Sequence, residues 1–352
     1  MLTLEELIKG IKEPKEEARK AALLHWDALA KPLGSLGLLE EDITKIAALI
    51  GKEEVRLDQA SLLVFCADNG VIAQGVSQSD ESVTSAVAKA LGEGTSTVNY
   101  MANAAGCKVC PVNIGMKEES ALPGVIHIPV KKGTNDFSQG PAMSRAECEK
   151  ALLAGAELVR KEKEAGAQII LLGEMGIGNT TSAAALSCLL LGESPERMCG
   201  RGAGLSDKGL QKKIKVIEKA IELNQPDRQE PIDLLSKVGG LDLAALTGAC
   251  LGGAYYDIPI ILDGLITCAA AVCALRLSDK CQKALLASHV SSEPAAELLL
   301  KELNLQAPIH AGLHLGEGTG AILAYELLKN VLAVYNSGHT FGHLGIDAYV
   351  PL

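Results

Sequence analysis

The chain has 352 residues, of which 48% are hydrophobic and only 3% aromatic, and it contains 36 glycines. This length exceeds what one hydrophobic core usually organises, so we expect one large domain with a smaller helical unit. The formal net charge of −10 excludes the basic surface that nucleic acids and anionic membranes require. The many glycines and few aromatic residues favour an α/β protein, and the negative charge favours a small-molecule ligand.

The first sixty residues have the pattern of three helices, expected over residues 4–11, 16–29 and 38–51, with a loop at 31–37. The N-terminus is amphipathic and mixed in charge, without the basic and then apolar order of a secretory signal. No apolar stretch is long enough to span a bilayer. We therefore expect a cytoplasmic protein.

The ten cysteines are scattered mostly through apolar segments, as at Cys66, Cys188 and Cys250. This distribution is typical of reduced thiols in a core rather than of a disulfide framework. The one CxxC pair, Cys107 and Cys110, lies in an expected strand, whose alternation places the two sulfurs on opposite faces. We expect neither a metal centre nor a redox pair there.

Apolar segments with the character of strands alternate with helical segments through the rest of the chain. Such alternation predicts an α/β fold, with a mostly parallel sheet flanked by helices. The last helical segment is expected to pack against the N-terminal helices, and the tail after it to be irregular. The expected strands are 61–70, 108–115, 124–130, 167–176, 258–264, 283–292 and 308–318, and the helices 144–166, 205–224, 241–256, 265–277 and 321–336.

Two glutamates, Glu174 and Glu317, have nearly the same sequence context. Each follows an apolar run and a glycine, and each precedes a glycine-rich turn and an alanine-rich stretch. We expect strand, loop and helix at both places. A glutamate at such a strand end lies on the ligand-binding edge of an open sheet, where glycines let backbone amides approach a phosphate. The pair predicts one site that holds an anion and a base.

The loop after the first glutamate contains Gly176 and Gly178, which free the backbone, and Asn179 and Thr180, which can donate hydrogen bonds to phosphate. Ordinary helix caps after a tight turn explain these residues equally well. The loop lacks the Lys-Ser/Thr ending of a nucleotide P-loop and the G-x-G-x-x-G spacing of dinucleotide sites. ATP and NAD are therefore disfavoured.

A second glycine-rich segment, residues 199–209, opens an expected helix and is followed by Lys213. This lysine either faces a phosphate or is a solvated residue of an amphipathic helix. Spacing alone favours the solvated position.

Glu317 lies between two glycines, where poor solvation raises a carboxyl pKa and suits a general base. Capping of the next helix is the alternative, but Thr319 is already available for that. His310 and His314 alternate with apolar residues, yet no carboxylate or cysteine at ligand spacing completes a metal site. We expect core or rim histidines and no metal.

Asp68 and Asp263 each end an expected strand, so their carboxylates come to the same edge of the sheet. One of them can orient ribose hydroxyls, and helix capping is an equal alternative for Asp68. Ser291 and Glu293 follow His289 at another strand-to-helix junction. A capping-box start is favoured there over contact with phosphate.

Seven motifs follow one another in an order that closely resembles the nicotinate-nucleotide:dimethylbenzimidazole phosphoribosyltransferase family over the whole chain. Each motif alone is weak, and the specificity comes from the ordered set. The motifs are KPLGSLGLLE at 31–40, ADNGV at 67–71, GPAMSR at 140–145, GEMGIGNTT at 173–181, SKVGGLDL at 236–243, LDG at 262–264 and LGEGTGA at 315–321.

The resemblance implies a Rossmann-like large domain over residues 60–320, a small helical domain built from 1–59 with 321–352, and a homodimer. It implies that the phosphoribosyl group of nicotinate mononucleotide moves to a benzimidazole-type base. The products are α-ribazole 5′-phosphate and nicotinate, in assembly of the cobalamin nucleotide loop. No cofactor is implied.

The resemblance also assigns residues. Glu317 matches the family's general base, and Glu174 matches its second active-site carboxylate. Together with Asp263 and Ser291 from the reasoning above, the residues expected around phosphate and ribose are Gly176, Gly178, Asn179, Thr180, Gly202 and Lys213. Those expected around the aromatic base are Ser79, Met175 and Leu315.

This chemistry suits a site with glutamates and no metal. The nicotinate leaving group has a cationic ring nitrogen, so its bond breaks through an oxocarbenium-like state that carboxylates stabilise. The enzyme must then position the nucleophile and remove its proton.

Two departures from relatives, Asn69 and Val87, leave the acceptor open among dimethylbenzimidazole, another benzimidazole and adenine. A noncatalytic module that binds a phosphorylated metabolite is the alternative function. A dinucleotide-dependent oxidoreductase is disfavoured by the glycine spacing.

Overall fold

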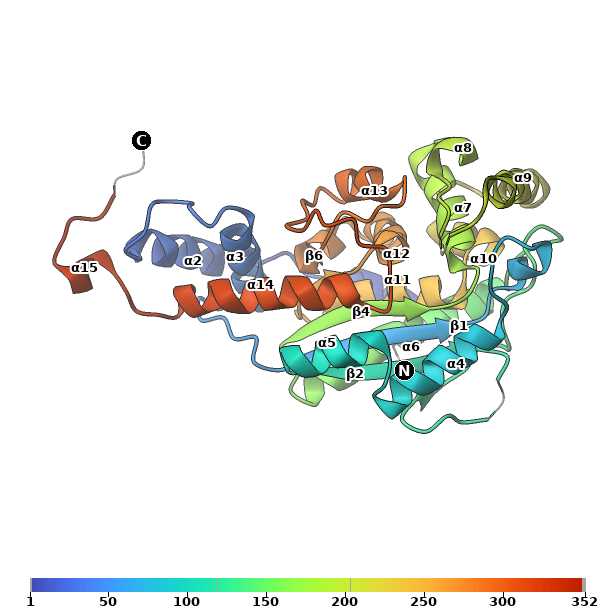
Figure 1. Ribbon diagram of the computed structural model, residues 1–352. Coiled ribbons are helices and arrows are strands. Elements are labelled where there is room, and N and C mark those ends of the chain that lie inside the picture. Colours follow the sequence, from blue (N-terminus) through green and yellow to red (C-terminus); the bar gives the residue numbers. More distant parts are fainter. Residues whose placement is uncertain (1, 119, 203, 350–352) are drawn as a thin grey trace.

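The computed structural model describes residues 2–118, 120–202 and 204–349 (Figure 1). Its strands form one parallel sheet in the order β3-β2-β1-β4-β5-β6, which is the strand order of a Rossmann fold. The predicted α/β class is confirmed, and every pairing in the sheet is parallel. The strands are β1 (Ala60–Ala67), β2 (Cys107–Gly115), β3 (Ile126–His127), β4 (Ile169–Met175), β5 (Ile260–Leu262) and β6 (Leu285–Ala287).

Both faces of the sheet are buried, because successive side chains of each strand point to opposite sides. In β1, Leu63 packs into a core with α6, α11 and α12, whereas Leu62 packs into a second core with α5 and α14. Cys107 and Cys110 are divided between these two cores, as the alternation predicted. The bounds are α5 (Thr97–Ala105), α6 (Arg145–Glu164), α11 (Leu241–Tyr255), α12 (Leu265–Leu277) and α14 (Thr319–Tyr335).

Glycines bring α6 and α11 into direct backbone contact. A Cβ atom on Gly155 would lie 1.9 Å from the carbonyl oxygen of Ala245, and one on Gly248 would lie 1.8 Å from that of Leu152. Neither backbone can withdraw, since both helices are packed into the core at this crossing. Glycine at these two positions is therefore a packing requirement.

We expect Gly248→Ala to lower the free energy of unfolding by about 1–3 kcal/mol, because the new methyl group overlaps backbone atoms. Alanine has a higher helix propensity than glycine, which alone would raise the free energy of unfolding by about 0.5–1 kcal/mol. A net loss of stability is therefore due to the clash. Urea denaturation measures the change. The control is Lys161→Ala on the exposed face of α6, with an expected change within about 0.5 kcal/mol. Unchanged stability of Gly248→Ala would contradict the packing argument.

Helices from the two chain ends meet at one end of the molecule, where α2 and α3 lie beside the end of α14 (Figure 1). Trp26 packs edge-on against Tyr335 with 4.7 Å between ring centroids, and the Ala30 N–H donates to the His339 carbonyl at 2.8 Å. The expected contact between the N- and C-terminal helices is confirmed. The first helix, α1, instead contacts α6 and α11. The N-terminal bounds are α1 (Leu4–Gly10), α2 (Glu16–Ala28) and α3 (Leu38–Ile50).

Four expected strands are much shorter than predicted or absent. β3, β5 and β6 have 2, 3 and 3 residues. Residues 308–318 form no strand beyond a single bridge from Ile309 to His289, because Gly312 and Gly316 have positive φ angles of 67° and 90°, which end an extended run. The two glutamates therefore do not have the same setting, since Glu317 follows an irregular segment.

Among the remaining helices, α4 contacts the sheet, whereas α7 to α10 and α13 contact other helices. α4, α5, α8 and α10 were not anticipated, and α15 interrupts the tail that was expected to be irregular; residues 350–352 of that tail lie outside the described part. Within the described residues, no helix is both long and apolar enough to cross a membrane. The bounds are α4 (Ser82–Glu93), α7 (Asn179–Leu191), α8 (Pro195–Met198), α9 (Asp207–Asn224), α10 (Pro231–Val238), α13 (Ala296–Glu302) and α15 (Phe341–Leu344), with 3₁₀ turns η1 (Gly70–Gln74) and η2 (Asp279–Ala284).

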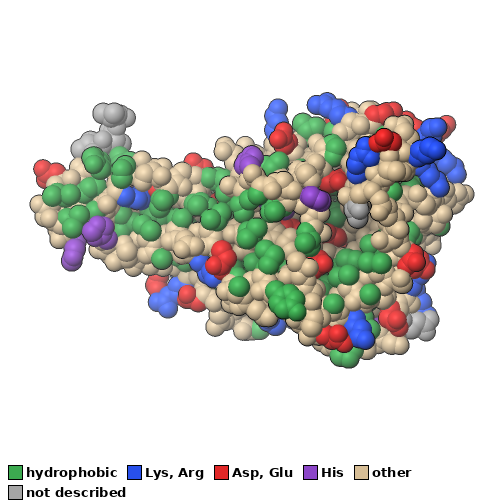
Figure 2. Space-filling view, viewed as in Figure 1, with side chains coloured by type: hydrophobic (Ala, Val, Ile, Leu, Met, Phe, Trp, Pro, Cys, Tyr) green, Lys and Arg blue, Asp and Glu red, His purple; other side chains and the backbone are tan. Residues whose placement is uncertain are grey.

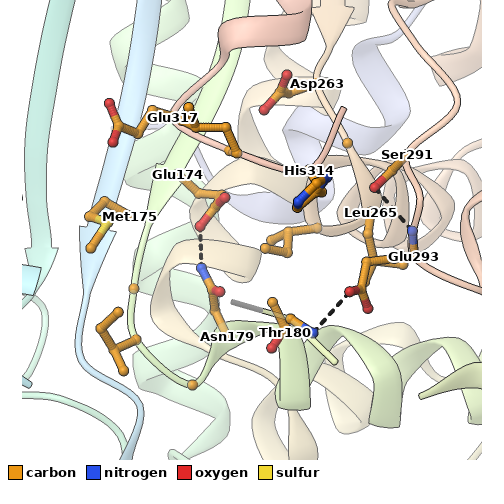
Figure 3. A pocket seen from close by; sticks show the side chains of 18 of the residues that line it. Glu174, Met175, Asn179, Thr180, Asp263, Leu265, Ser291, Glu293, His314 and Glu317 are labelled. Atoms are coloured by element: carbon orange, nitrogen blue, oxygen red, sulfur yellow. Dashed lines mark hydrogen bonds between the residues drawn. The ribbon is translucent and has the colours of Figure 1, made fainter. Parts of the chain in front are cut away.

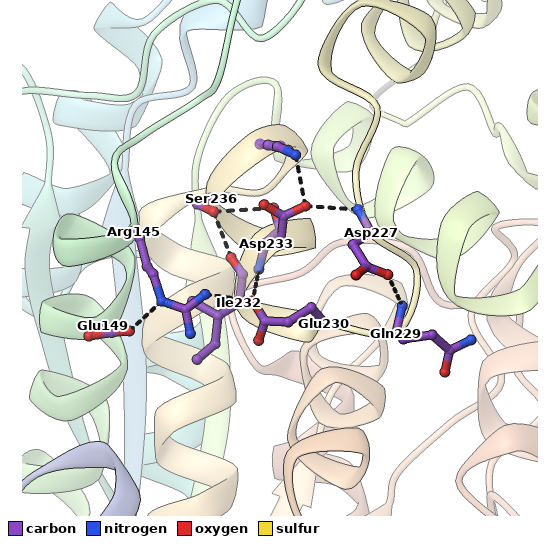
Figure 4. Close-up of polar contacts among 9 residues, drawn as sticks. Arg145, Glu149, Asp227, Gln229, Glu230, Ile232, Asp233 and Ser236 are labelled. Carbon is purple, nitrogen blue, oxygen red and sulfur yellow. Dashed lines mark hydrogen bonds and ion pairs between the residues drawn. The ribbon is translucent and has the colours of Figure 1, made fainter.

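The motifs at residues 140–145 and 236–243 lie side by side and join α6 to α10 (Figure 4). The Ala142 and Met143 N–H groups donate to the carbonyls of residues 237 and 236 at 3.0 and 2.9 Å. Arg145 pairs with Glu149 and with Glu230, at 2.8 and 2.6 Å. Because these ion pairs are exposed, they contribute little, and the backbone bonds hold the junction. This junction leads the chain into α11 and the site.

Candidate active site

A cavity of about 300 Å³ opens at the carboxyl ends of β4 and β5, beside the point where the strand order reverses (Figure 3). Ligands of open α/β sheets bind at this position. The predicted residues that line the cavity are Glu174, Met175, Gly176, Gly178, Asn179, Thr180, Gly202, Asp263, Ser291, Leu315 and Glu317.

Two predicted residues do not line the cavity. Ser79 lies outside the lining, to which its neighbours Ser77 and Gln78 belong. The Ser79 N–H donates to the Ser77 hydroxyl at 3.2 Å. Lys213 lies fully buried beneath the cavity wall.

The two Gly-Glu segments pack against each other, which explains why both contain glycine before the glutamate. A Cβ atom on Gly173 would lie 2.5 Å from the backbone oxygen of Glu317, and one on Gly316 would lie 2.8 Å from a carboxylate oxygen of Glu174. Each glycine thus makes room for the glutamate of the other segment. The sequence predicted that the two loops meet, and the structure brings them together.

Glu174 belongs to a buried chain of polar groups below the cavity. The side-chain amide of Asn179 donates to the Glu174 carboxylate (Figure 3) and also to Asp242, the latter at 3.0 Å. Asp242 comes from the start of α11 and was not singled out in the sequence, although its motif was. Burial raises the pKa of Glu174 to about 8 and that of Asp242 to about 6. Glu174 is therefore mostly protonated at neutral pH.

The raised pKa of Glu174 makes the stability of the fold depend on pH. A group whose pKa is higher in the folded state stabilises the fold at low pH and loses that contribution as the pH rises to its folded pKa, here from about 4.5 to about 8. We expect the free energy of unfolding of the wild type to fall relative to Glu174→Gln over this interval, by on the order of a few kcal/mol. Urea denaturation from pH 5 to 9 measures it, and parallel pH profiles would contradict it.

Glu317 precedes α14 in a left-handed backbone conformation, with φ of 59°. This conformation is unfavourable for a residue with a side chain and is typical of functional sites. Its half-buried carboxylate accepts the Val98 N–H, at the N-terminal end of α5, at 3.5 Å. Burial raises the pKa of Glu317, whereas the Val98 N–H and Ser96 lower it. The group therefore combines a raised pKa with access to the cavity.

Asp263 holds the start of α14 in place. One carboxylate oxygen accepts the Gly318 N–H at 3.1 Å, and the other accepts those of Gly320 and Ala321 at 2.8 and 3.2 Å. These bonds satisfy three of the free N–H groups at a helix N-terminus. The structure supports a positioning role for Asp263 toward Glu317.

Lys213 is fully buried, so the prediction of a solvated lysine was wrong. The apolar face of α9 turns inward at Ile214 and Ile217 and takes Lys213 with it. Its ammonium donates to the Thr180 hydroxyl and to the Gly200 carbonyl, both at 3.1 Å. Burial lowers the pKa of this lysine, and the Glu293 carboxylate raises it. A buried cation beside the start of α7 is suited to bind an anion.

Glu293 is a second site residue whose position the sequence predicted wrongly. The favoured capping-box start is not formed, because α13 begins only at Ala296, after Pro294, and has no side-chain cap. The carboxylate instead accepts the Gly202 N–H at 2.9 Å (Figure 3). Its partner is 91 residues away, so no local pattern could have found the contact.

The structure also places the other polar residues that the sequence singled out, which are Asp68, His310 and His314. Asp68 accepts the Lys117 N–H at 2.7 Å and caps no helix. His310 and His314 are exposed, and His314 lines the cavity. Among the residues that the structure describes, no group of three or more His, Cys, Asp or Glu side chains is arranged to hold a metal ion.

Comparisons with known proteins agree with this fold and site. A family model described as a phosphoribosyltransferase matches residues 11–346. The nicotinate-nucleotide–dimethylbenzimidazole phosphoribosyltransferase of Ruminiclostridium cellulolyticum is 40% identical over 351 residues, which is 100% of each chain. That of Acetivibrio thermocellus is 38% identical and covers 98% of this chain and 99% of its own.

Solved structures lead to the same family. CobT from Thermus thermophilus superimposes with a TM-score of 0.89 and 37% identity, covering 94% of this chain and 99% of its own. A second structure from that organism, a nicotinate-nucleotide–dimethylbenzimidazole phosphoribosyltransferase, has a TM-score of 0.88 and 36% identity, covering 95% and 100%. The fold and site define a phosphoribosyltransferase. The chain belongs to the nicotinate-nucleotide–dimethylbenzimidazole phosphoribosyltransferase family.

Proposed function

We propose that the protein transfers the phosphoribosyl group of nicotinate mononucleotide to a benzimidazole-type base. One observation supports this above all: the carboxylates of Glu174 and Glu317 line the same cavity as Thr180, which accepts a hydrogen bond from the buried Lys213. The cavity thus has a side for a phosphate and a side for a base.

In the proposed reaction, the unprotonated ring nitrogen of the acceptor attacks the anomeric carbon, and the bond from that carbon to the nicotinate nitrogen breaks. The bonding electrons return to the nicotinate ring, which leaves without needing a proton. Glu317 accepts the proton from the other ring nitrogen of the acceptor. The attack inverts the anomeric carbon and gives the α-linked product.

The phosphate and ribose are proposed to bind along the loops at 176–180 and 200–202, with Lys213 beneath them and Ser291 opposite. Gly178 has a positive φ of 95° and directly precedes α7, so the N-terminal amides of that helix face the cavity. The aromatic base is proposed to lie on the apolar side, which Val87, Met175 and Leu315 line. Ser79 contributes from the edge of the site.

The test is to incubate the protein with nicotinate mononucleotide and dimethylbenzimidazole and to look for α-ribazole 5′-phosphate and nicotinate by mass spectrometry. Parallel reactions contain benzimidazole or adenine, because the acceptor is the least constrained substrate. Binding of the mononucleotide without turnover on any of these bases would instead support a noncatalytic binding module. Binding of NAD with hydride transfer would support an oxidoreductase.

We further propose a homodimer, for which an exposed apolar face gives support. Tyr100 on α5 and Leu323, Leu327 and Val334 on α14 are exposed, and Figure 2 shows hydrophobic side chains along this part of the molecule. Light scattering should give about twice the chain mass of 36.7 kDa, and Leu327→Glu should shift the mass toward one chain. Leu223→Glu, at an exposed leucine of α9, is the control. A monomeric wild type would contradict the proposal.

The domain division into residues 60–320 and residues 1–59 with 321–352 is proposed on the contacts of α2 and α3 with each other and of α3 with α14. Limited proteolysis with first cuts inside the sheet region would contradict it. A cytoplasmic location is proposed because all ten cysteines are free and buried. Cell fractionation tests that location.

A further inference from the structure

The proposed phosphate position contains three hydrogen-bond donors, which we call the anion corner: the Thr180 hydroxyl, the Gly202 N–H and the Lys213 ammonium. They are close together, since a Cβ atom on Gly202 would lie 2.9 Å from the Thr180 hydroxyl, and Lys213 donates to that same hydroxyl at 3.1 Å. Thr180 is the second residue of α7, so the positive end of this helix faces the same point.

The corner is only partly used by the protein itself. The Lys213 ammonium has three N–H donors, and within the described residues two of them are bound, by Thr180 and by the Gly200 carbonyl. Lys213 also has no carboxylate within 4.0 Å in the described part of the chain, although it is fully buried. A buried cation without a direct counter-ion favours the binding of an anion.

An anion of the protein already occupies part of this corner. Glu293 reaches across from the loop after β6, and one of its carboxylate oxygens accepts the Gly202 N–H at 2.9 Å. The other oxygen is buried and has no hydrogen-bond partner among the described residues. A buried carboxylate oxygen without a partner is costly, so this arrangement is easily displaced by a better-bound anion.

Glycine at position 200 is what lets the carboxylate lie there. A Cβ atom on Gly200 would be 2.0 Å from the unpartnered Glu293 oxygen and 2.4 Å from its carboxyl carbon. The carboxylate therefore rests directly on the backbone of the loop. A phosphate that approaches the Gly202 N–H must enter the same space.

We propose that Glu293 tunes the affinity for the mononucleotide: its carboxylate occupies the phosphate position of the unliganded protein, and the phosphate of the mononucleotide displaces it. This inference rests on the proposed function, because it concerns the same mononucleotide site. A phosphate dianion has three terminal oxygens and can bind all three donors of the corner, whereas the carboxylate binds one. A nucleoside without phosphate leaves the carboxylate in place, so Glu293 lowers the affinity of the site for phosphorylated ligands alone.

Glu293→Gln tests the inference, because glutamine keeps the acceptor for the Gly202 N–H but has no charge. Calorimetric titration with nicotinate mononucleotide, without an acceptor base, should show about tenfold tighter binding than the wild type, since the ligand no longer displaces an anion. The matching nucleoside, nicotinate riboside, should bind both proteins equally. Glu297→Gln removes an exposed charge from the neighbouring helix α13 and should change neither affinity.

Equal or weaker mononucleotide binding by Glu293→Gln, with an unchanged unfolding midpoint, would overturn the inference. If that variant does not fold, Glu293→Asp replaces it, because a carboxylate one methylene shorter leaves the corner and should also bind the mononucleotide more tightly. A wild type that binds no mononucleotide contradicts the proposed function itself. A wild type that transfers phosphoribosyl groups while Glu293→Gln binds unchanged contradicts only the role of Glu293.

Discussion

Glu317→Gln is expected to lower the rate of phosphoribosyl transfer by about 10²–10⁴-fold while the protein still binds nicotinate mononucleotide. Glutamine fits the same half-buried position and still accepts the Val98 N–H, but it cannot take a proton from the acceptor base. Because the loss concerns the chemical step, kcat should fall and the affinity for the mononucleotide should stay close to that of the wild type. Single-turnover kinetics and calorimetry measure the two quantities.

The pH profile separates a general base from a residue that only supports the loop. Glu317 must be ionised to act, and burial raises its pKa above the ordinary value of 4.5, so wild-type activity should rise with pH through the folded pKa. This acid limb should disappear in Glu317→Gln. The control is Glu222→Gln on the exposed face of α9. Full activity of Glu317→Gln, or an acid limb that remains, would exclude Glu317 as the base.

Lys213→Met is expected to weaken mononucleotide binding by about 2–5 kcal/mol, which is a factor of about 30 or more. Methionine has a similar length and fills the buried space under Thr180 without the ammonium group. Stability should be unchanged or higher, since a buried apolar side chain replaces a buried charge that lacks a direct counter-ion. The Michaelis constant for the mononucleotide should therefore rise in a protein that remains folded.

Lys215→Met, which removes an exposed cation from the same helix, is the matched control. It should leave the Michaelis constant unchanged at moderate ionic strength, because exposed charges are screened. Binding of nicotinate riboside should not respond to Lys213→Met, since this ligand has no phosphate. If both lysine variants bind the mononucleotide like the wild type, the phosphate does not lie at the anion corner.

The sequence by itself determined the parts of the protein that depend on near neighbours. The alternation of strand-like and helical segments predicted the parallel sheet. The alternation of side chains along one strand predicted that Cys107 and Cys110 lie on opposite faces. The ordered motifs identified the family, and the two Gly-Glu steps identified Glu174 and Glu317. Local reasoning failed where glycines with positive φ interrupted an apolar run, as at residues 308–318, because hydrophobicity does not report backbone conformation.

Only the tertiary structure decided which polar groups are buried and what they contact. Lys213 and Thr180 are 33 residues apart, Asn179 and Asp242 are 63 apart, and Gly202 and Glu293 are 91 apart. A periodic pattern shows which face of a helix is apolar, but it does not show what the fold places against that face. The burial of Lys213 and the position of Glu293 arise from loops that meet only when the sheet is assembled, so their roles follow from the fold and not from local sequence.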